Sequence, residues 1–259
     1  MTTLMWSCSD DEGEVRMGLN SDDLTGKASL VLTAPAVTSG TTYYLDRDNP
    51  TTAFETFTTT SAVADASAVS QYYLEVTTTD KTFDKGQVVG PFTTPSFSVT
   101  NQELNDIFIA LGKNEAADLR MRVRQDVTLG DMVGTYYSPV MTHTIVGWYD
   151  LYAVGAGLKE AGWVWDTPVV LKGNKGVFKT TAPVTFVTNG GWGTFRFFLQ
   201  KNWNPTSYNF LYYADKGFTI DTKLVNKDDG DKNFQYVGTD ATKYNITIDY
   251  VNKTITLTP

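Results

Sequence analysis

Short stretches of β-branched and aromatic residues, several of which alternate with polar residues, recur through the first half of the chain. Such alternation is typical of half-buried β-strands, whose successive side chains point to opposite faces of a sheet. The stretches are residues 28–33, 54–58, 71–77, 97–100 and 119–124. Prolines and other turn-forming residues separate them. The pattern predicts a β-sandwich of immunoglobulin or fibronectin type III kind that ends near residue 145.

One segment of the first half has a different spacing. Its apolar residues at positions 104, 107, 108 and 111 lie three or four apart, as they do on one face of a helix. Thr100 or Asn101 can cap the N-terminus of this helix, and Gly112 can end it. We therefore expect one helix over residues 101–112 in an otherwise β-rich half.

Strand patterns continue in the second half. They cover residues 149–155, 169–171, 176–180, 194–199 and 218–220. Residues 244–249 and 253–257 then form a hairpin pattern about a short turn. We expect an all-β protein in which residues 1–25 precede two sandwich domains, 26–145 and 146–259.

Charge narrows the set of partners. The net charge is −8 and the pI is about 4.7, with no basic stripe. An acidic surface repels phosphate backbones, so the sequence predicts no nucleic-acid partner. No apolar run is long enough to span a bilayer, so contact with a membrane would need an anchor.

The residues that enzymes and metal sites commonly use are scarce. The chain has one cysteine and one histidine, which excludes an internal disulfide and argues against a zinc site or a Ser-His-Asp triad. His143 lies in an alternating pattern and is read as a strand residue. Residues 228–233 lack the EF-hand spacing and are typical of a hairpin turn. We predict a protein without catalytic activity, metal or cofactor.

The start of the chain suggests a lipid anchor. Residues 4–8 read Leu-Met-Trp-Ser-Cys, which is typical of a lipobox that ends in a lipidated cysteine, Cys8. The acidic segment that follows has no apolar periodicity and is expected to be a solvated tether. Most of a signal peptide is missing before Cys8, so we expect the natural precursor to begin further upstream.

Five of the six tryptophans lie in the second half: Trp148, Trp163, Trp165, Trp192 and Trp203. A sandwich of this size needs only one or two tryptophans in its core, so some of these five are candidates for ligand contact. Trp148 and Trp192 are equally compatible with structural roles. Trp163 and Trp165 would point to opposite faces of an extended segment, so one of them is expected in the core.

Trp203 lies in a loop context that suits a sugar. Pro205 interrupts the preceding strand pattern, and Lys201, Asn202 and Asn204 flank the tryptophan. A flat aromatic ring can cover the apolar face of a sugar while amide and ammonium groups bond its hydroxyls. Tyr208 either extends this surface or packs beneath it.

These motifs together resemble the SusE/SusF-type surface glycan-binding lipoproteins of gut-type Gram-negative bacteria. The segments that carry the resemblance are 6–12, 30–35, 73–76, 99–105 and 119–124 in the first half, and 151–155, 161–163 and 195–197 followed by Trp203 in the second. The resemblance implies a fibronectin-like spacer domain followed by a carbohydrate-binding-module-like β-sandwich. By the same resemblance Trp163 and Trp203 form the sugar platform, and Arg196, Lys201 and Asn204 bond hydroxyls.

The resemblance also implies a function. We expect non-catalytic binding of polysaccharide or oligosaccharide at the outer membrane, beside a SusC/SusD-type importer and surface glycoside hydrolases. Family members often carry two or three glycan modules, whereas this chain has room for one, and the glycan stays open between a starch-like α-glucan and a fructan. The alternative is a structural or adhesive β-sandwich surface protein that binds no glycan.

Overall fold

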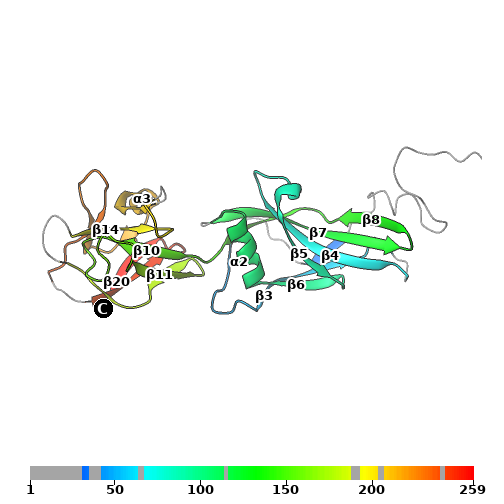
Figure 1. Cartoon of the computed structure of the whole chain (residues 1–259), viewed down its shortest axis with the longest axis horizontal. Coiled ribbons are helices and arrows are strands. Elements are labelled where there is room, and N and C mark those ends of the chain that lie inside the picture. Colours follow the sequence, from blue (N-terminus) through cyan, green and yellow to red (C-terminus); the bar gives the residue numbers. More distant parts are fainter. Residues whose placement is uncertain are drawn as a thin grey trace, which may run out of the picture. The chain divides into compact units, whose positions relative to one another are not determined.

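The computed structural model describes residues 31–34, 42–63, 67–113, 116–187, 193–203, 207–239 and 243–259. Within them β-strands predominate, accompanied by the helices α2 (Asn101–Ala110) and α3 (Phe210–Asp215) and the 3-10 turn η1 (Phe83–Lys85) (Figure 1). The all-β prediction is therefore confirmed. No helix in the described part of the chain is long and apolar enough to cross a membrane.

The chain forms two compact units. The first unit comprises residues up to Tyr43 together with Pro50–Ile145, and the second comprises Tyr44–Asn49 together with Val146–Pro259. The N-terminal segment 1–25, with the proposed lipid site Cys8, lies outside the described residues, as do Trp192 and Asn204. We describe each unit by itself.

Two sheets contain the strands of the first half. A three-stranded sheet has the order β1 (Val31–Ala34), β3 (Ala53–Thr60), β6 (Ser96–Thr100). A six-stranded sheet has the order β2 (Thr42–Tyr44), β9 (Met141–Val146), β7 (Ala117–Leu129), β4 (Val69–Thr78), β5 (Gln87–Phe92), with β8 (Met132–Tyr137) paired to β7.

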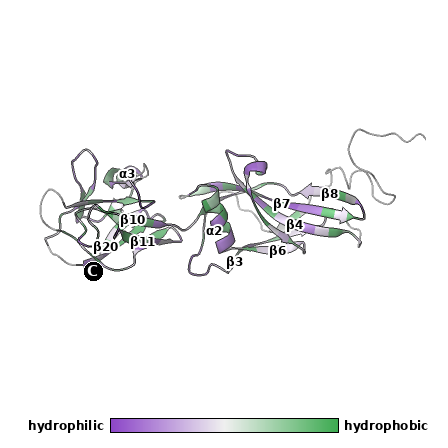
Figure 2. Cartoon of the chain, viewed as in Figure 1, coloured by the Kyte–Doolittle hydropathy of each residue, from purple (hydrophilic) through white to green (hydrophobic). Residues whose placement is uncertain are grey.

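The predicted period of two is clear in β7, along which hydrophobic and hydrophilic residues follow one another (Figure 2). Leu119, Met121 and Val123 are fully buried, and the arginines between them lie on the opposite face. Two of these arginines, Arg122 and Arg124, bind the same carboxylate, Glu75 of β4, at 2.7 Å each. Cross-strand ion pairs thus hold these two arginines on the outer face of β7.

The predicted helix is present as α2. Thr100 is its N-cap: the side chain of Thr100 accepts the N–H of Glu103, and the Glu103 carboxylate accepts the N–H of Thr100 at 2.8 Å. This reciprocal pair satisfies two backbone donors that the first turn leaves unpaired. Leu104 and Phe108 are buried, as the spacing of apolar residues predicts. Gly112, with φ 75°, follows the last turn.

A sheet of eleven strands forms the second unit. Its main path has the order β16 (Thr219–Ile220), β20 (Thr254–Thr258), β19 (Lys243–Asp249), β12 (Val177–Thr180), β11 (Val169–Asn174), β10 (Asp150–Val154), β14 (Thr194–Phe198), β18 (Phe234–Tyr236), β17 (Leu224–Asn226). β13 (Val184–Thr185) pairs with β19, and β15 (Ser207–Tyr208) pairs with β14. The predicted terminal hairpin is the antiparallel pair β19–β20.

A short segment distant in sequence completes the second unit. Residues 44–49 join the second unit through Leu45, whose N–H donates to the Val146 carbonyl at 3.0 Å, and through Arg47, whose side chain pairs with Asp150 of β10. The backbone N–H of Arg47 also donates to Asn174 Oδ1 at 2.8 Å. The sequence placed this segment in the first domain. The hydrogen bonds and the ion pair of this segment join it to residues more than a hundred positions away along the chain, so no periodic pattern indicates them.

The single histidine gives the first unit a defined response to acid. His143 is buried on β9, its ring lies 5.0 Å from that of Tyr43, and no hydrogen-bond partner of its Nδ1 is found among the described residues. Burial lowers the pKa of His143 below its ordinary value of 6.5, while the charge of Glu55 opposes the shift. Below pH 6.5 the unfolded chain therefore binds a proton that the folded chain resists, and the folded state loses stability.

We expect the free energy of unfolding of the first unit to fall as the pH is lowered from 7.5 to 5.5. His143→Leu removes the titrating group at similar volume and should flatten this dependence. Urea unfolding at several pH values measures both proteins. Parallel pH profiles for the wild type and the variant would contradict the assignment.

Candidate functional site

Strand β14 presents different side chains to its two faces. Phe195 and Phe197 are fully buried in the core of the second unit, whereas Arg196 and Phe198 lie on the opposite face. On the neighbouring strand β10, Tyr152 pairs with Phe198 and Val154 pairs with Arg196. The outer face of β10 and β14 is the floor on which the candidate site lies.

The loop after β10 returns the chain to this floor through two glycines. The N–H of Gly155 donates to the carbonyl of Gly162 at 2.7 Å, which closes the loop. Both have positive φ, 153° and 61°, and a Cβ on Gly155 would lie 2.1 Å from the carbonyl oxygen of Thr194. Position 155 therefore accepts only glycine. Trp163 follows Gly162 directly, and its ring centre lies 6.0 Å from the Arg196 guanidinium carbon.

Three tryptophans gather near Phe198, two of them in contact with its ring and the third in contact with Trp203. The ring centres of Trp163 and Trp203 are 6.2 Å apart with planes inclined by 38°, and those of Trp165 and Trp203 are 4.7 Å apart. Trp165 and Trp203 both meet the ring of Phe198 edge-on, at 4.9 and 5.6 Å. We call these four residues the tryptophan cluster.

Exposure differs within the tryptophan cluster. Trp203 is 56% exposed, Phe198 is only 3% exposed, and Trp163 and Trp165 are half-buried. The expectation that either Trp163 or Trp165 is a core residue rested on an extended segment. The segment is a loop, not a strand, so both side chains reach the same cluster.

The predicted polar residues take different positions. Arg196 is held by three acceptors, whereas Lys201 is exposed and its Nζ lies 5.4 Å from the Tyr152 ring centre. Asn202 donates its side-chain N–H to Gln200 Oε1 at 3.1 Å. The structure thus brings Trp163, Trp165, Trp203 and Arg196 together and places Lys201 and Asn202 on the adjoining loop.

Tyr208 packs beneath this face. It is 1% exposed, pairs with Phe197 across β14 and β15, and its ring centre lies 4.6 Å from that of Tyr212. A ring buried in this way cannot cover a sugar, so of the two roles expected for Tyr208 the structure shows packing. Trp148, at 8% exposure, is also a buried residue.

Sequence reasoning did not find two residues of this region. Asp231 and Asn233, from the turn between β17 and β18, both bind Arg196 at 2.7 Å. The segment 228–233 is a turn, as its Asp-Gly sequence indicates, but nothing local shows that it meets a strand more than 30 residues earlier. Phe198 was read only as part of a strand.

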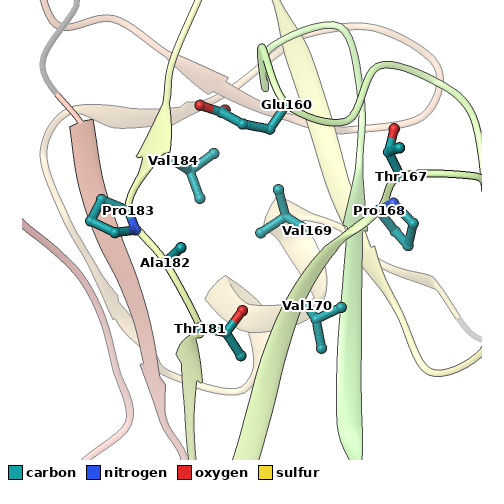
Figure 3. A pocket seen from close by; sticks show the side chains of 9 residues that line it. All are labelled: Glu160, Thr167, Pro168, Val169, Val170, Thr181, Ala182, Pro183 and Val184. Carbon is teal, nitrogen blue, oxygen red and sulfur yellow. The ribbon is translucent and has the colours of Figure 1, made fainter.

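The second unit also has a separate hollow of about 250 Å³ (Figure 3). It is lined by Glu160, Thr167, Pro168, Val169, Val170, Thr181, Ala182, Pro183 and Val184. Most of these side chains are apolar, and the Glu160 carboxylate accepts the backbone N–H of Thr185 at 2.9 Å. None of the tryptophans that the structure describes is among the lining residues. The hollow is smaller than usual ligand pockets and offers few polar groups, so the tryptophan cluster is the better candidate site.

Comparison with known proteins supports the resemblance found in the sequence. The family described as SusE outer membrane protein matches residues 20–124. The match confirms the SusE-type resemblance over that stretch and supports an outer-membrane protein of a starch-utilisation system. The tryptophan cluster lies outside the matched residues. Comparisons with curated proteins and with solved structures found no match.

The geometry of the tryptophan cluster predicts unequal effects on stability. Trp165 is wedged between Trp203 and Phe198, so Trp165→Ala should leave a cavity and lower the free energy of unfolding by about 2–3 kcal/mol. Trp203 is mostly exposed, and Trp203→Ala should cost about 1 kcal/mol or less. Chemical denaturation of both variants measures the difference. Equal losses would show that Trp203 supports the fold as much as Trp165 does.

Proposed function

We propose that the second unit binds polysaccharide at the cell surface and does not cleave it. The observation that carries this proposal is that the exposed ring of Trp203 lies 6.2 Å from that of Trp163, which in turn lies beside Arg196. Exposed aromatic groups that gather beside polar groups mark binding surfaces. In a sugar complex the tryptophan rings would cover the apolar faces of the sugar rings, and the polar neighbours would form hydrogen bonds with the sugar hydroxyls.

The inclination of the two rings bears on the choice of glycan. The planes of Trp163 and Trp203 meet at 38°, so together they form a shallow bend, not a flat platform. A bend follows a curved chain of sugars better than a straight chain. Of the two glycans suggested by the resemblance, we therefore place a starch-like α-glucan first and a fructan second.

The other residues proposed for this site have supporting roles. Trp165 and Phe198 hold Trp203 from below, Lys201 and Asn202 offer donors from the loop, and Asn204 is adjacent in sequence. Tyr208 has no place in the proposed contact surface because it is buried. The first unit would act as a spacer of fibronectin or immunoglobulin type.

The family match supports the setting of this activity. A SusE-type outer-membrane protein would hold polysaccharide near a SusC/SusD-type importer and surface glycoside hydrolases. We propose that a lipid on Cys8 anchors the chain and that the acidic segment after it is the tether. The protein would then supply bound glycan to enzymes and importer without chemistry of its own.

The decisive test is loss of binding without loss of fold. Trp203→Ala and Trp163→Ala should each weaken binding by about 2 kcal/mol or more, roughly thirtyfold, because a few aromatic residues carry most of the energy of such sites. Native gel retardation in polysaccharide measures the loss, and a reducing-sugar assay should show no release by the wild type.

Tyr137→Ala is the matched control. Tyr137 is an aromatic side chain of the first unit that is 41% exposed, and its removal should leave retardation unchanged. If Tyr137→Ala abolishes retardation while Trp203→Ala does not, binding belongs to the first unit and the proposal is wrong. Release of reducing sugar would instead indicate a glycosidase.

The anchor is tested separately. In a precursor with a complete leader, Cys8→Ala should move the protein from the membrane fraction to the soluble fraction, because the lipid on Cys8 supplies the membrane affinity. Fractionation and metabolic labelling with a fatty acid measure the change. Cys8→Ala protein that remains membrane-bound would contradict the lipid anchor.

A further inference from the structure

We infer that Asp231 is a specificity-determining residue of the tryptophan site, and that with Arg196 it makes a charge-balanced clamp for two neighbouring hydroxyls of a neutral glycan. This inference rests on the proposed glycan-binding function and adds to it a residue and a class of excluded ligand. It begins with the way in which Arg196 is held.

Three separate acceptors fix the guanidinium of Arg196. Its Nε donates to Asn233 Oδ1 at 2.7 Å, its Nη2 lies 2.7 Å from Asp231 Oδ2, and its Nη1 lies 3.5 Å from Ser207 Oγ. Asn233 is itself buried, at 4% exposure, and contacts Asp229 through both its backbone and its side chain at 3.4 Å. Arg196 is therefore oriented before any ligand arrives, which reduces the entropy lost on binding.

The turn that carries Asp231 is also fixed. The backbone carbonyl of Asp231 accepts a hydrogen bond from Asn209 Nδ2 at 3.0 Å, and the carbonyl of Lys232 accepts one from Phe210 N–H at 3.0 Å. Lys232 takes a positive φ of 52° to close the turn. These bonds tie the turn to the start of α3, so the position of Asp231 beside Arg196 is built into the fold.

The ion pair lies at the edge of the tryptophan cluster. The side chain of Arg196 is only 16% exposed, whereas that of Asp231 is 69% exposed. The Arg196 guanidinium carbon lies 6.0 Å from the Trp163 ring centre and 5.9 Å from that of Phe198. A sugar that covers Trp163 would thus meet the pair along its rim.

The hydrogen-bond donors and acceptors that remain on Arg196 and Asp231 suit two neighbouring hydroxyls. A guanidinium has five N–H donors, and the three contacts above use three of them, one on each nitrogen. An ionised carboxylate has about four acceptor sites, of which this ion pair uses one. The pair can therefore donate to one hydroxyl and accept from the next. Adjacent hydroxyls on a sugar ring present that combination.

The charge balance between Arg196 and Asp231 decides which class of glycan is excluded from the site. Asp231 neutralises Arg196 locally, so this pair offers hydrogen bonds without net charge. The carboxylate of a uronic acid would find the Arg196 guanidinium already paired, and Asp231 would repel it. We therefore expect neutral glycans to bind and polyuronates to be rejected.

The experiment compares Asp231→Ala, Asp231→Asn and the control Asp228→Ala in affinity electrophoresis. Asp228 belongs to the same turn, but its 93% exposed side chain pairs with Lys232 instead of Arg196. The gels contain a starch-like α-glucan, a fructan or polygalacturonate. Melting temperatures confirm that each variant is folded, and Asp231→Asn keeps the shape of the side chain if Asp231→Ala does not fold.

We expect the wild type and Asp228→Ala to be retarded by one of the neutral glycans and not by polygalacturonate. Asp231→Ala should lose about tenfold or more in affinity for the neutral glycan, the loss expected when one member of a hydrogen-bonded charge pair is removed. It should also gain measurable retardation by polygalacturonate, because the cation of Arg196 is then uncompensated. Asp231→Asn should change both affinities in the same directions.

Three outcomes would overturn the inference. Unchanged neutral-glycan binding in both Asp231 variants would remove Asp231 from the site while leaving the proposed function intact. Wild-type binding to polygalacturonate as strong as to the neutral glycans would refute the charge-balance argument alone. A wild type retarded by no polysaccharide would refute the proposed function and this inference together.

Discussion

The packing of Phe195 and Phe197 against the core is the constraint on which the second unit depends. Both rings are fully buried, and both lie 5.4 Å from the ring of Phe234 on the neighbouring strand. Because side chains alternate across a strand, burying these two fixes Arg196 and Phe198 on the outer face. A shift of the strand by one residue would bury a cation and expose the core, so the register is strongly specified.

The same register organises the tryptophan cluster. Phe198 is an outer-face residue that is nevertheless 3% exposed, because Trp165 and Trp203 cover it edge-on. The loop that carries Trp165 is returned to the strand by the glycine closure at 155 and 162. An apolar floor thus holds exposed aromatic groups in place, at little cost in stability because the tryptophans also exclude water from Phe198.

Much of this architecture could be predicted from the sequence, and the part that could not has a physical cause. The strands, the helix with its cap at Thr100 and the terminal hairpin all depend on local periodicity, which a sequence displays directly. Trp163 and Trp203 became candidates because the surplus of tryptophans in the second half is visible in the sequence, whereas Arg196 became one only through the resemblance to SusE/SusF-type proteins. Asp231 and residues 44–49 were missed because the residues they bind are distant in sequence, and such pairings leave no periodic trace.

The division between apolar and polar contacts also separates fold from specificity. Apolar packing fixes where β14 and its loops lie, but any sugar can cover a tryptophan ring, so the rings alone discriminate little between glycans. Discrimination has to come from groups whose loss leaves a partner unsatisfied. In the proposed site such groups would be those of the Arg196 network, which joins a strand and a turn more than 30 residues apart. Under the proposed function, a substitution in that turn would change which glycan is accepted while the aromatic surface and the core remain as they are.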